Sequence, residues 1–483
     1  MSQDLSLSNW RKKEKNALDL LTILGDLRFD KNVELMYFHH DLYDSRPSEI
    51  INTLSFSTKY TSTPIEIDTA LAITRAISNV ENLAPSKIDL GKLCMEWLEG
   101  DKDKFESVEA FANSKLSEYI GWGKKDLKAK DVVLYGFGRI GRLVARRIVQ
   151  TTGKGEQLVL RAIVLRMKMK TVGEELEKRA ALLRQDSVHG AFNGVVNIDA
   201  ENEEMIINGN RVKIIFAGKP ADIDYTEYGI QNGIVIDNTG VWRNKEQLSG
   251  HLRPGIVQVM LTAPGDGVPN IVHGINQKEL DFEKDNVFSA ASCTTNAIAP
   301  VLKVIHDKFG IDKGHIETIH AYTNDQNLID NFHKKPRRGR GAPLNMVLTS
   351  TGAAKAVGKV IPDMVGILTG NAVRVPTPNV SLAIMSLTLK EAVDLDLINN
   401  TLRHAALHGK LVEQIHYSND TEFVSHDALG LTSTSILDAP SSIVSKDGLT
   451  VTLYVWYDNE YGYSCQVVRL AKYVSQVRRL RYY

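Results

Sequence analysis

Gly136-Phe137-Gly138-Arg139-Ile140-Gly141 is the stretch that decides the fold, because of what stands on either side of it. Residues 131–135 are mostly apolar and β-prone, and helical spacing follows the glycines through Ile148. In a strand–turn–helix unit, the first glycine permits a tight turn, the second lets a pyrophosphate approach the backbone, and the third lets the helix pack on the strand. The motif alone also occurs in ordinary glycine-rich turns, but these flanks favour a dinucleotide-binding βαβ unit.

The end of the second predicted strand, residues 158–165, indicates which dinucleotide binds. An acidic residue here hydrogen-bonds the adenosine ribose and disfavours a 2′-phosphate. The strand is instead followed by Arg166-Met167-Lys168-Met169-Lys170, which contains no acid. Arg166 and Lys168 suit a 2′-phosphate, so NADP fits at least as well as NAD. The alternative is that both are solvated loop charges.

A second informative stretch is Ser292-Cys293-Thr294-Thr295-Asn296, which lies between the short apolar run 286–291 and a segment with helical spacing, 296–309. A thiol at a helix N-terminus lies near free amide N–H groups and the positive end of the macrodipole. These favour the thiolate and can hold an oxyanion. Cys293 is therefore a candidate nucleophile, with a buried structural cysteine as the alternative.

The composition of the whole chain excludes several functional classes. Its 483 residues contain 58 Lys and Arg and 58 Asp and Glu, so no net charge attracts nucleic acid or acidic membranes. Cys94, Cys293 and Cys465 are too widely spaced for a metal or redox motif and suit a reducing compartment. With no secretory signal and no apolar run that could span a bilayer, we expect a cytoplasmic protein without metal, nucleic-acid or membrane partners.

The periodicity divides the chain into three parts. Residues 1–127 form a predicted helical N-terminal extension, with Ser86 and Asp89 as candidate caps and helices over 16–27, 67–83, 90–98 and 105–120. From residue 128 strands alternate with helices, which predicts an α/β fold, a Rossmann-type dinucleotide-binding domain over 128–291, completed by a C-terminal helix over 459–483. Long strand-like segments at 380–390 and 449–457 predict an α+β catalytic domain over 292–458, with a mixed, largely antiparallel sheet.

Several motifs in order carry a family resemblance. The three strongest are Gly136-Phe137-Gly138-Arg139-Ile140-Gly141-Arg142, Ala291-Ser292-Cys293-Thr294-Thr295-Asn296 and Trp456-Tyr457-Asp458-Asn459-Glu460. Further blocks agree in sequence order: Asp186-Ser187-Val188-His189-Gly190, Thr323-Asn324-Asp325-Gln326, Thr349-Ser350-Thr351-Gly352-Ala353-Ala354-Lys355 and Arg374-Val375-Pro376-Thr377-Pro378-Asn379. From about residue 128 to its end, the chain resembles the phosphorylating glyceraldehyde-3-phosphate dehydrogenases.

The resemblance implies a reaction with Cys293 as nucleophile and His320 as its partner base. Glyceraldehyde 3-phosphate forms a hemithioacetal on Cys293, hydride passes to the nicotinamide of NAD or NADP, and inorganic phosphate cleaves the resulting thioester to 1,3-bisphosphoglycerate. We expect a thiolate paired with an imidazolium. The imidazole then takes the hydroxyl proton as hydride leaves.

The resemblance also assigns the binding residues. It places the substrate phosphate in a site formed by Thr323, Asp325 and Arg374, in which Asp325 orients donors and does not itself receive the phosphate. It places the attacking phosphate on Ser292, Thr294, Thr351 and Gly352, with Arg374 reaching between the two sites. The Thr351-Gly352 run could also cap a helix. The cofactor residues are Gly136, Phe137, Gly138, Arg139, Ile140, Gly141, Arg166, Thr239, Gly240, Thr262, Asn459 and Tyr463. Asn459 is expected to hold the nicotinamide carboxamide, and Tyr463 to pack beside the ring.

Because the family forms homotetramers, the resemblance implies a homotetramer here, with residues 327–341 as the interface loop. That loop contains the basic run 334–340, which we interpret as solvated or subunit-contacting, with an anion patch as the alternative.

Departures from the family pattern lie on the adenosine side of the cofactor. Tyr135 stands where Asn is usual, and Asn331-Phe332 stands where NAD-specific members commonly carry Leu-Pro. Together with the absence of an acidic residue after the strand at 158–165, these departures favour NADP use or dual specificity. Ala297 replaces a usual second cysteine, so Cys293 has no neighbouring thiol in the sequence.

Two alternatives stay open. The erythrose-4-phosphate dehydrogenases are similar, but the blocks around Thr351 and Thr323 have the triose form, which favours glyceraldehyde 3-phosphate. Residues 1–127 could also be a module that binds a protein partner, with the dehydrogenase as scaffold.

Overall fold

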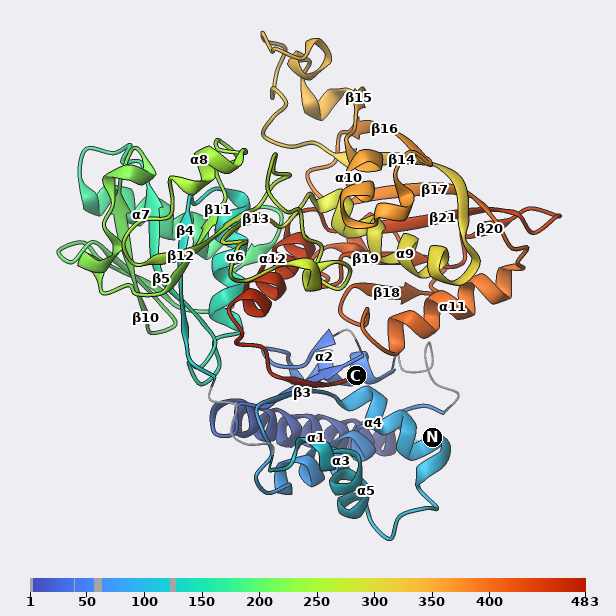
Figure 1. Ribbon diagram of the computed structural model, residues 1–483. Helices are drawn as coiled ribbons and strands as arrows, with labels where there is room; N and C mark the ends of the chain where they lie inside the picture. Colours follow the sequence, from blue (N-terminus) through green and yellow to red (C-terminus); the bar gives the residue numbers. More distant parts are fainter. Residues whose placement is uncertain (1–2, 39, 56–62, 122–126) are drawn as a thin grey trace.

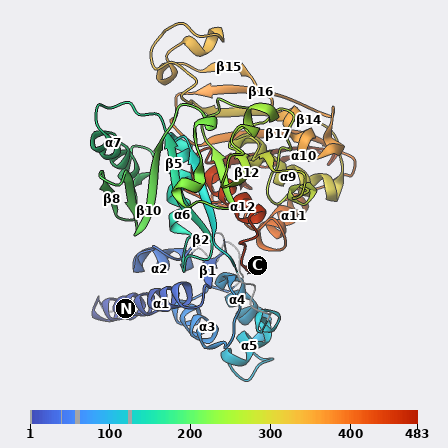
Figure 2. The same ribbon diagram turned by 60° about the vertical axis from the view of Figure 1, so that its left-hand side comes forward.

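The computed structural model describes residues 3–38, 40–55, 63–121 and 127–483. Figures 1 and 2 show two sheet-containing domains side by side and the N-terminal extension beneath both, with the C-terminus returning to the extension. No helix among the described residues combines the length and the apolar character needed to cross a bilayer.

The dinucleotide-binding domain is built on an eight-stranded sheet. Its strands are rich in buried Val, Ile and Leu, as expected where helices cover both faces of a parallel sheet. The order is β13-β12-β11-β4-β5-β10-β9-β8, with bounds β4 Lys130–Tyr135, β5 Leu158–Leu165, β8 Val196–Asp199, β9 Glu204–Ile207, β10 Asn210–Phe216, β11 Gly233–Asp237, β12 Ile256–Leu261 and β13 Val287–Ser289. The chain reverses its strand order between β4 and β11, which opens a crevice at the carboxyl ends of these strands.

Four helices belong to this domain: α6 Arg139–Gln150, α7 Val172–Arg184, α8 Lys245–Ser249 and α12 Tyr461–Val474. A small hairpin, β6 Gln185–Asp186 with β7 Gly190–Ala191, follows α7. Helix α12 packs against α6 and shares its core, so the C-terminal part of the chain does complete this domain. The predicted helix over 459–483 is too long, however, because α12 ends at Val474 and the chain then leaves the domain.

The catalytic domain has the predicted mixed, largely antiparallel sheet, in the order β15-β16-β14-β17-β21-β19-β18, with β20 on β21. The bounds are β14 Ile311–Ala321, β15 Val347–Ser350, β16 Leu368–Val375, β17 Ser381–Leu389, β18 Ile415–Ser418, β19 Ser435–Asp438, β20 Ile443–Val444 and β21 Thr450–Tyr457. Burial alternates along β17 and β21, because one face of the sheet packs on helices α9 Cys293–Phe309, α10 Ala353–Val360 and α11 Leu395–Leu407.

The extension is helical, as predicted, but it also contains a sheet that the sequence did not predict. Its helices are α1 Gln3–Phe29, α2 Pro47–Ser55, α3 Ile67–Asn79, α4 Leu90–Glu96 and α5 Val108–Lys115. The sheet has the order β2-β1-β3-β22, with β1 Glu34–Tyr37, β2 His40–Asp41, β3 Ser86–Asp89 and β22 Leu480–Tyr482. Asp89 caps α4 by accepting from the Lys92 N–H, but Ser86 lies in β3 and caps no helix.

Strand β22 comes from the C-terminus of the chain and pairs with β3 of the extension. The core of the extension also includes Leu407 of α11, from the catalytic domain. The extension is therefore joined to the body of the protein by sheet hydrogen bonds and by a shared core.

Candidate functional site

The Gly136 turn has the backbone geometry that a pyrophosphate site needs. Gly136 has a φ of 92°, and a side chain there would meet Thr239 at 2.8 Å. A Cβ on Gly141 would lie 2.4 Å from the Gly136 carbonyl oxygen, so the helix can approach the strand only because this residue is glycine. Gly138 caps α6, and a Cβ on it would meet no atom within 4 Å. Open space therefore lies before the N-terminus of α6, where an anion is favoured.

The other residues of the motif direct their side chains away from this space. Phe137 is buried in the domain core, and Ile140 packs against the same core. The Arg139 guanidinium donates to Glu460 at 2.6 Å and to Asp186 at 3.1 Å. These three residues can therefore contact a bound dinucleotide only through their backbone atoms. Arg139 also fixes the turn to the residue that follows Asn459.

Asn459 and Tyr463 stand at the start of the α12 region, where the two domains meet. The Asn459 carboxamide oxygen accepts from the Ser381 hydroxyl at 2.8 Å, and the Ser381 hydroxyl accepts from the backbone N–H of Ala321. The Asn459 amide nitrogen donates to no described residue, so it is free to donate to a ligand. Tyr463 donates to the Ala291 carbonyl at 2.8 Å, two residues before Cys293. These contacts hold the nicotinamide-binding candidates against both Cys293 and the strand that carries His320.

Thr239, Gly240 and Thr262 lie at the carboxyl ends of β11 and β12. The Thr239 hydroxyl donates to the Asp237 carboxylate at 2.7 Å, and the Thr262 hydroxyl donates to the Asp237 carbonyl at 3.0 Å. Gly240 has a φ of 63°, which glycine adopts without strain. The three residues thus line the crevice at the switch in strand order.

On the adenosine side, β5 ends at Leu165 as predicted, and Arg166 begins an exposed loop. Arg166 donates to the Gly218 carbonyl at 3.2 Å. Two acids lie in the first turn of α7. Glu174 forms a capping box with Thr171, and Glu175 is buried and accepts from the N–H groups of Lys168 and Met169 and from Arg179. Glu175 is therefore not available to a ribose. Tyr135 packs edge-on against Trp242 and His251 beneath this region.

Cys293 is the first residue of α9. The Ser292 hydroxyl caps the helix by accepting from the Thr295 N–H at 3.0 Å. Ala291 has a φ of 56°, an uncommon conformation for a residue with a side chain, and it turns the chain sharply from β13 into α9. The Cys293 sulfur lies 3.7 Å from Nε2 of His320.

The hydrogen bonds of His320 define its tautomer. Its Nδ1 lies 2.7 Å from the Ala321 carbonyl oxygen, which can only accept, and 3.1 Å from Arg374 Nη1, which can only donate. The shorter contact favours the proton on Nδ1, with the Nε2 lone pair facing the thiol. Arg374 Nη1 donates to the same carbonyl at 2.8 Å and lies 3.4 Å from the Thr323 hydroxyl. The nucleophile, a base in the correct tautomer and a cation thus converge.

The expected thiolate–imidazolium pair is not what this geometry favours. Burial raises the pKa of the Cys293 thiol, and Arg374 and the hydrogen bonds of Thr294 offset this only in part. Burial, with the positive charge of Arg374, lowers the pKa of the His320 imidazole to about 3. Both shifts oppose the expected thiolate–imidazolium pair, because burial leaves either ion poorly solvated and a guanidinium stands beside the base.

The substrate-phosphate candidates lie around Arg374. Thr323 follows β14 directly after Tyr322, within reach of Arg374. Asp325 pairs with Arg338, whose guanidinium also donates to Thr349 at 3.1 Å. The basic run is therefore solvated only in part, because Arg338 is buried while Lys334, Lys335, Arg337 and Arg340 are exposed.

The attacking-phosphate candidates come from two helix starts. Ser292 caps α9, and the Thr294 hydroxyl lies 3.0 Å from the Tyr457 hydroxyl, where it is largely buried. Gly352 is the N-cap of α10, which packs on α9, and the Thr351 hydroxyl accepts from the Ala353 N–H at 3.1 Å. The capping role weighed for this run is therefore present, and a Cβ on Gly352 would meet only open space.

Sequence reasoning missed Ser381, Tyr457 and Arg338. Ser381 orients Asn459 and follows Val380, whose φ of 66° is rare for a β-branched residue. Tyr457 lies in a quoted motif and Arg338 in the basic run, but neither was assigned a role, and no motif marks Ser381, whose partner Asn459 is 78 residues away. Within the described ranges, no group of three His, Cys, Asp or Glu side chains is placed to hold a metal ion.

Comparison with known proteins accounts for this arrangement. The family model described as glyceraldehyde 3-phosphate dehydrogenase, NAD binding domain, matches residues 130–245, and that for the C-terminal domain matches residues 292–459. A glyceraldehyde-3-phosphate dehydrogenase-like protein of Pseudomonas aeruginosa is 47% identical over 95% of this chain and 98% of its own. Glyceraldehyde-3-phosphate dehydrogenase 1 of Bacillus cereus is 40% identical over 70% of this chain and 97% of its own.

The Pseudomonas protein is matched along nearly all of this chain, including the extension, whereas the Bacillus enzyme is matched over a length that corresponds to the body alone. The glycine turn and the open space before α6 fit a nicotinamide dinucleotide, NAD or NADP, as the cofactor. The chain belongs to the glyceraldehyde-3-phosphate dehydrogenase family, as an oxidoreductase with an N-terminal extension.

Proposed function

We propose that the protein catalyses the reversible oxidative phosphorylation of D-glyceraldehyde 3-phosphate to 1,3-bisphosphoglycerate. The observation that carries this proposal is the 3.7 Å approach of the Cys293 sulfur to the unprotonated Nε2 of His320, at the N-terminus of α9. A thiol in this position can attack an aldehyde and hold an acyl group.

The residues of the chain carry the proton transfers. His320 Nε2 accepts the thiol proton as sulfur attacks the aldehyde carbon, and the N–H groups at the start of α9 stabilise the developing oxyanion. The imidazolium then returns this proton to the oxyanion, which gives the hemithioacetal hydroxyl and restores the neutral imidazole. When bound, the nicotinamide accepts the hydride of the hemithioacetal. His320 takes the hydroxyl proton at this step, which leaves a thioester on Cys293. Attack of phosphate then releases the acyl phosphate and the thiol.

The two phosphate positions remain part of the proposal. Thr323 and Arg374 form a hydroxyl and guanidinium pair near Cys293 that suits the substrate phosphate. Asp325 is not a phosphate ligand in this scheme but holds Arg338 in place. The starts of α9 and α10, with Ser292, Thr294, Thr351 and Gly352, suit the attacking phosphate.

Initial rates with glyceraldehyde 3-phosphate and erythrose 4-phosphate, each with and without inorganic phosphate, test the reaction. We expect reduction of the cofactor to depend on phosphate and to be faster with the triose phosphate. A rate that is equal without phosphate, or that is higher with erythrose 4-phosphate, would contradict the proposal.

We expect the Arg166→Asp, Lys168→Asp double variant to change the cofactor preference. The two cations suit a 2′-phosphate and the introduced acids suit a free ribose hydroxyl, so the ratio of kcat/KM for NADP to that for NAD should fall by about 10- to 100-fold. Steady-state kinetics with both cofactors measure this ratio. Lys178→Asp, which reverses one cation on the exposed face of α7 away from this loop, is the control. An unchanged ratio would mean that the loop charges are only solvated.

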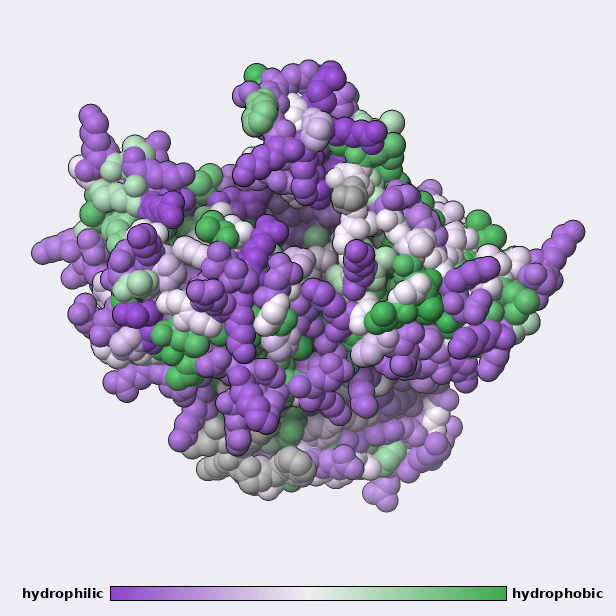
Figure 3. All heavy atoms as spheres, turned by 45° about the horizontal axis from the view of Figure 1, so that its top comes forward, coloured by the Kyte–Doolittle hydropathy of each residue, from purple (hydrophilic) through white to green (hydrophobic). Residues whose placement is uncertain are grey.

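We also infer that the protein is a homotetramer and that residues 327–341 contribute to the interface. This segment projects from the catalytic domain, and green apolar spheres interrupt the hydrophilic surface of the projecting lobe (Figures 1 and 3). Leu328, Ile329 and Phe332 are 74%, 73% and 89% exposed. Apolar side chains gathered in this way indicate a surface that another subunit covers.

Phe332→Asp is therefore expected to weaken the assembly, because it places a charge in an apolar contact. Size-exclusion chromatography with light scattering at micromolar concentration should show species smaller than a tetramer. Val195→Asp, which is also exposed but lies in the other domain, should leave the mass unchanged. A tetramer that persists in the Phe332 variant would remove this loop from the interface.

A further inference from the structure

A strongly cationic cavity lies where the extension meets the body of the protein, distinct from the Cys293 site. Its volume is about 50 Å³, and seven Lys or Arg side chains line it against two carboxylates. Three parts of the chain supply the cations: Lys87 from β3 of the extension, Arg147 from α6, and Lys472 and other residues from α12 and the C-terminal segment. The whole chain carries no formal net charge, so this excess is a local feature.

The carboxylates around the cavity are already shared among several cations. Glu413 pairs with Arg481 at 2.6 Å, Lys87 at 3.5 Å and Arg469 at 3.8 Å. Its pKa lies well below the usual range, mainly because these cations outweigh the effect of burial. One negative charge thus serves three positive charges on this side.

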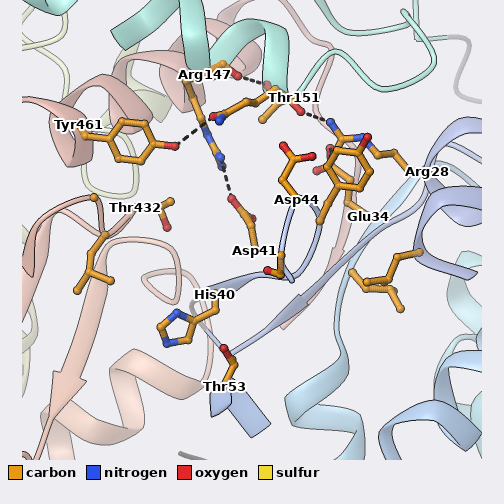
Figure 4. Close-up of a pocket in the computed structure, with 17 residues that line it drawn as sticks. Arg28, Glu34, His40, Asp41, Asp44, Thr53, Arg147, Thr151, Thr432 and Tyr461 are labelled. Carbon is orange, nitrogen blue, oxygen red and sulfur yellow. Dashed lines mark hydrogen bonds and ion pairs between the residues drawn. The ribbon is translucent and has the colours of Figure 1, made fainter. Parts of the chain in front are cut away.

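On the opposite side of the cavity, too, a single carboxylate is shared by more than one cation. Glu34 pairs with Arg479 at 3.1 Å and Arg28 at 3.8 Å. Asp41, next to the cavity, pairs with Arg147 at 2.7 Å, and Figure 4 shows the Arg147 side chain reaching between Asp41 and Tyr461. Asp41 also pairs with Lys87 at 3.5 Å. Glu413, Glu34 and Asp41 are therefore each shared by more than one cation.

Two cations that line the cavity feel the charge of a nearby carboxylate but form no ion pair at bonding distance with any described residue. Lys472 forms no ion pair or hydrogen bond with any residue in the described ranges, and Arg478 only contacts the ring of Tyr473, 5.5 Å from its centroid. Arg479 is buried, with only 8% of its surface exposed, and its Nη2 has no hydrogen-bond partner among the described residues. Buried donors of this kind are normally satisfied, so these groups are suited to donate to an acceptor bound in the cavity.

Electrostatics indicate that the missing acceptor is an anion. Burial, together with the positive charges of Arg479 and Arg147, lowers the pKa of Lys472 to about 7, and the opposing effect of Glu34 offsets this only in part. The C-terminal ends of α6 and α12 lie here too, and each contributes about half a negative charge. The partial negative charges of these two helix ends do not balance the excess positive charge of the Lys and Arg side chains. A bound divalent oxyanion would balance it.

The size and donor types indicate which anion. One water molecule needs about 10–15 Å³ of cavity volume. This cavity of about 50 Å³ therefore holds a group of a few heavy atoms. Guanidinium groups and an ammonium group converge on it, and their fork and point geometries match tetrahedral phosphate oxygens. The cavity shares Glu34, Arg147 and Thr151 with a neighbouring cavity of about 280 Å³ (Figure 4), which could accommodate the organic part of a phosphate ester.

We propose that this cavity is a phosphate-binding site that fastens the extension to the dehydrogenase body. The phosphate oxygens accept from Lys472, Arg478 and Arg479, while Lys87 and Arg147 hold the opposite wall. The ligand is either inorganic phosphate or the phosphate group of a small ester. The proposal does not depend on the reaction at Cys293.

The test uses the full chain in an Arg374→Leu background, which removes the main cation from the catalytic anion sites. Inorganic phosphate is expected to raise Tm by about 2–4 °C relative to chloride at equal ionic strength. Calorimetric titration should show one phosphate site per chain. A sugar phosphate that binds more tightly than inorganic phosphate would identify an ester as the ligand, and tighter binding of inorganic phosphate would identify the free ion.

Added to that background, Lys472→Met with Arg478→Met should abolish the phosphate-dependent rise in Tm, with at least about a tenfold loss of phosphate affinity. Lys472→Met alone should leave Tm without phosphate unchanged or higher, because it removes an unpaired buried cation. If Lys472 only stabilised the fold, Lys472→Met would instead lower Tm in the absence of phosphate. Lys472→Arg should keep the response, as should Lys410→Met, which removes an exposed cation elsewhere.

The proposal is overturned if phosphate and chloride have equal effects in the Arg374→Leu background, or if the Lys472, Arg478 variant responds as strongly as its parent. Neither result would bear on the reaction, because the kinetics of the otherwise unaltered enzyme test that separately.

Discussion

Replacing Cys293 with serine is expected to lower the rate of phosphate-dependent aldehyde oxidation by about 10³-fold or more. The serine hydroxyl is a poor nucleophile beside a base whose pKa is lowered to about 3, and the ester it would form resists attack by phosphate. Initial rates of cofactor reduction measure the loss. Cofactor binding should persist, because the glycine turn and Asn459 do not depend on the thiol.

Cys465→Ser is the matched control, since Cys465 is buried in α12 and takes no part in the proposed chemistry. It should keep most of the activity. Retention of phosphate-dependent oxidation by the Cys293 variant would remove the covalent mechanism altogether.

Replacing Arg374 with leucine is expected to lower kcat/KM for the phosphorylated aldehyde by about 10²- to 10³-fold. Arg374 contacts the Ala321 carbonyl and the Thr323 hydroxyl, and it supplies positive charge at the proposed substrate phosphate. For an aldehyde without a phosphate group, kcat/KM should fall much less. This comparison separates a loss of phosphate recognition from a general loss of activity.

The same variant should shift the ionisation of the catalytic pair. Arg374 lowers the pKa of both the Cys293 thiol and the His320 imidazole, so its removal raises both. The pH midpoint for alkylation of Cys293 by iodoacetamide should therefore move upward. Arg161→Leu, which removes a half-exposed arginine paired with Asp131, should change neither property. An alkylation profile that does not move in Arg374→Leu would mean that this cation does not act on the thiol.

Much of the dehydrogenase body could be predicted from local patterns. Strands β4, β5, β17 and β21 and helices α6 and α9 lie within a few residues of their predicted bounds, because their apolar spacing and glycine or serine boundaries are local signals. The position of Cys293 at a helix start was predictable for the same reason. The family motifs then identified His320 and Arg374, which local spacing could not connect to it.

The extension shows where such reasoning failed. Its helices have a 3.6-residue period, but β1, β2, β3 and β22 are two to four residues long and too short to produce a clear alternation. Strand β22 pairs with β3 across almost the whole chain, and Arg479 hydrogen-bonds Asn32 at a separation of 447 residues. No local pattern carries that information, so a C-terminal helix was predicted where a strand crosses to the extension.

The ionisation of the catalytic pair was also outside the reach of sequence. A helix start favours a thiolate, but the pKa values depend on how deeply both groups are buried and on the cation beside the base, which are tertiary quantities. The side chains of Phe137 and Arg139 show the same limit, since the motif specifies their backbone and not their partners.

By itself, the sequence determined the Rossmann turn, the nucleophile at the start of α9 and the family, because these depend on residue type at short spacing. Only the tertiary structure decided the tautomer of His320, the support of Asn459 by Ser381, and the cationic cavity between extension and body. Each of these brings together groups from distant segments, and their energies depend on burial and on distance in space rather than on order along the chain.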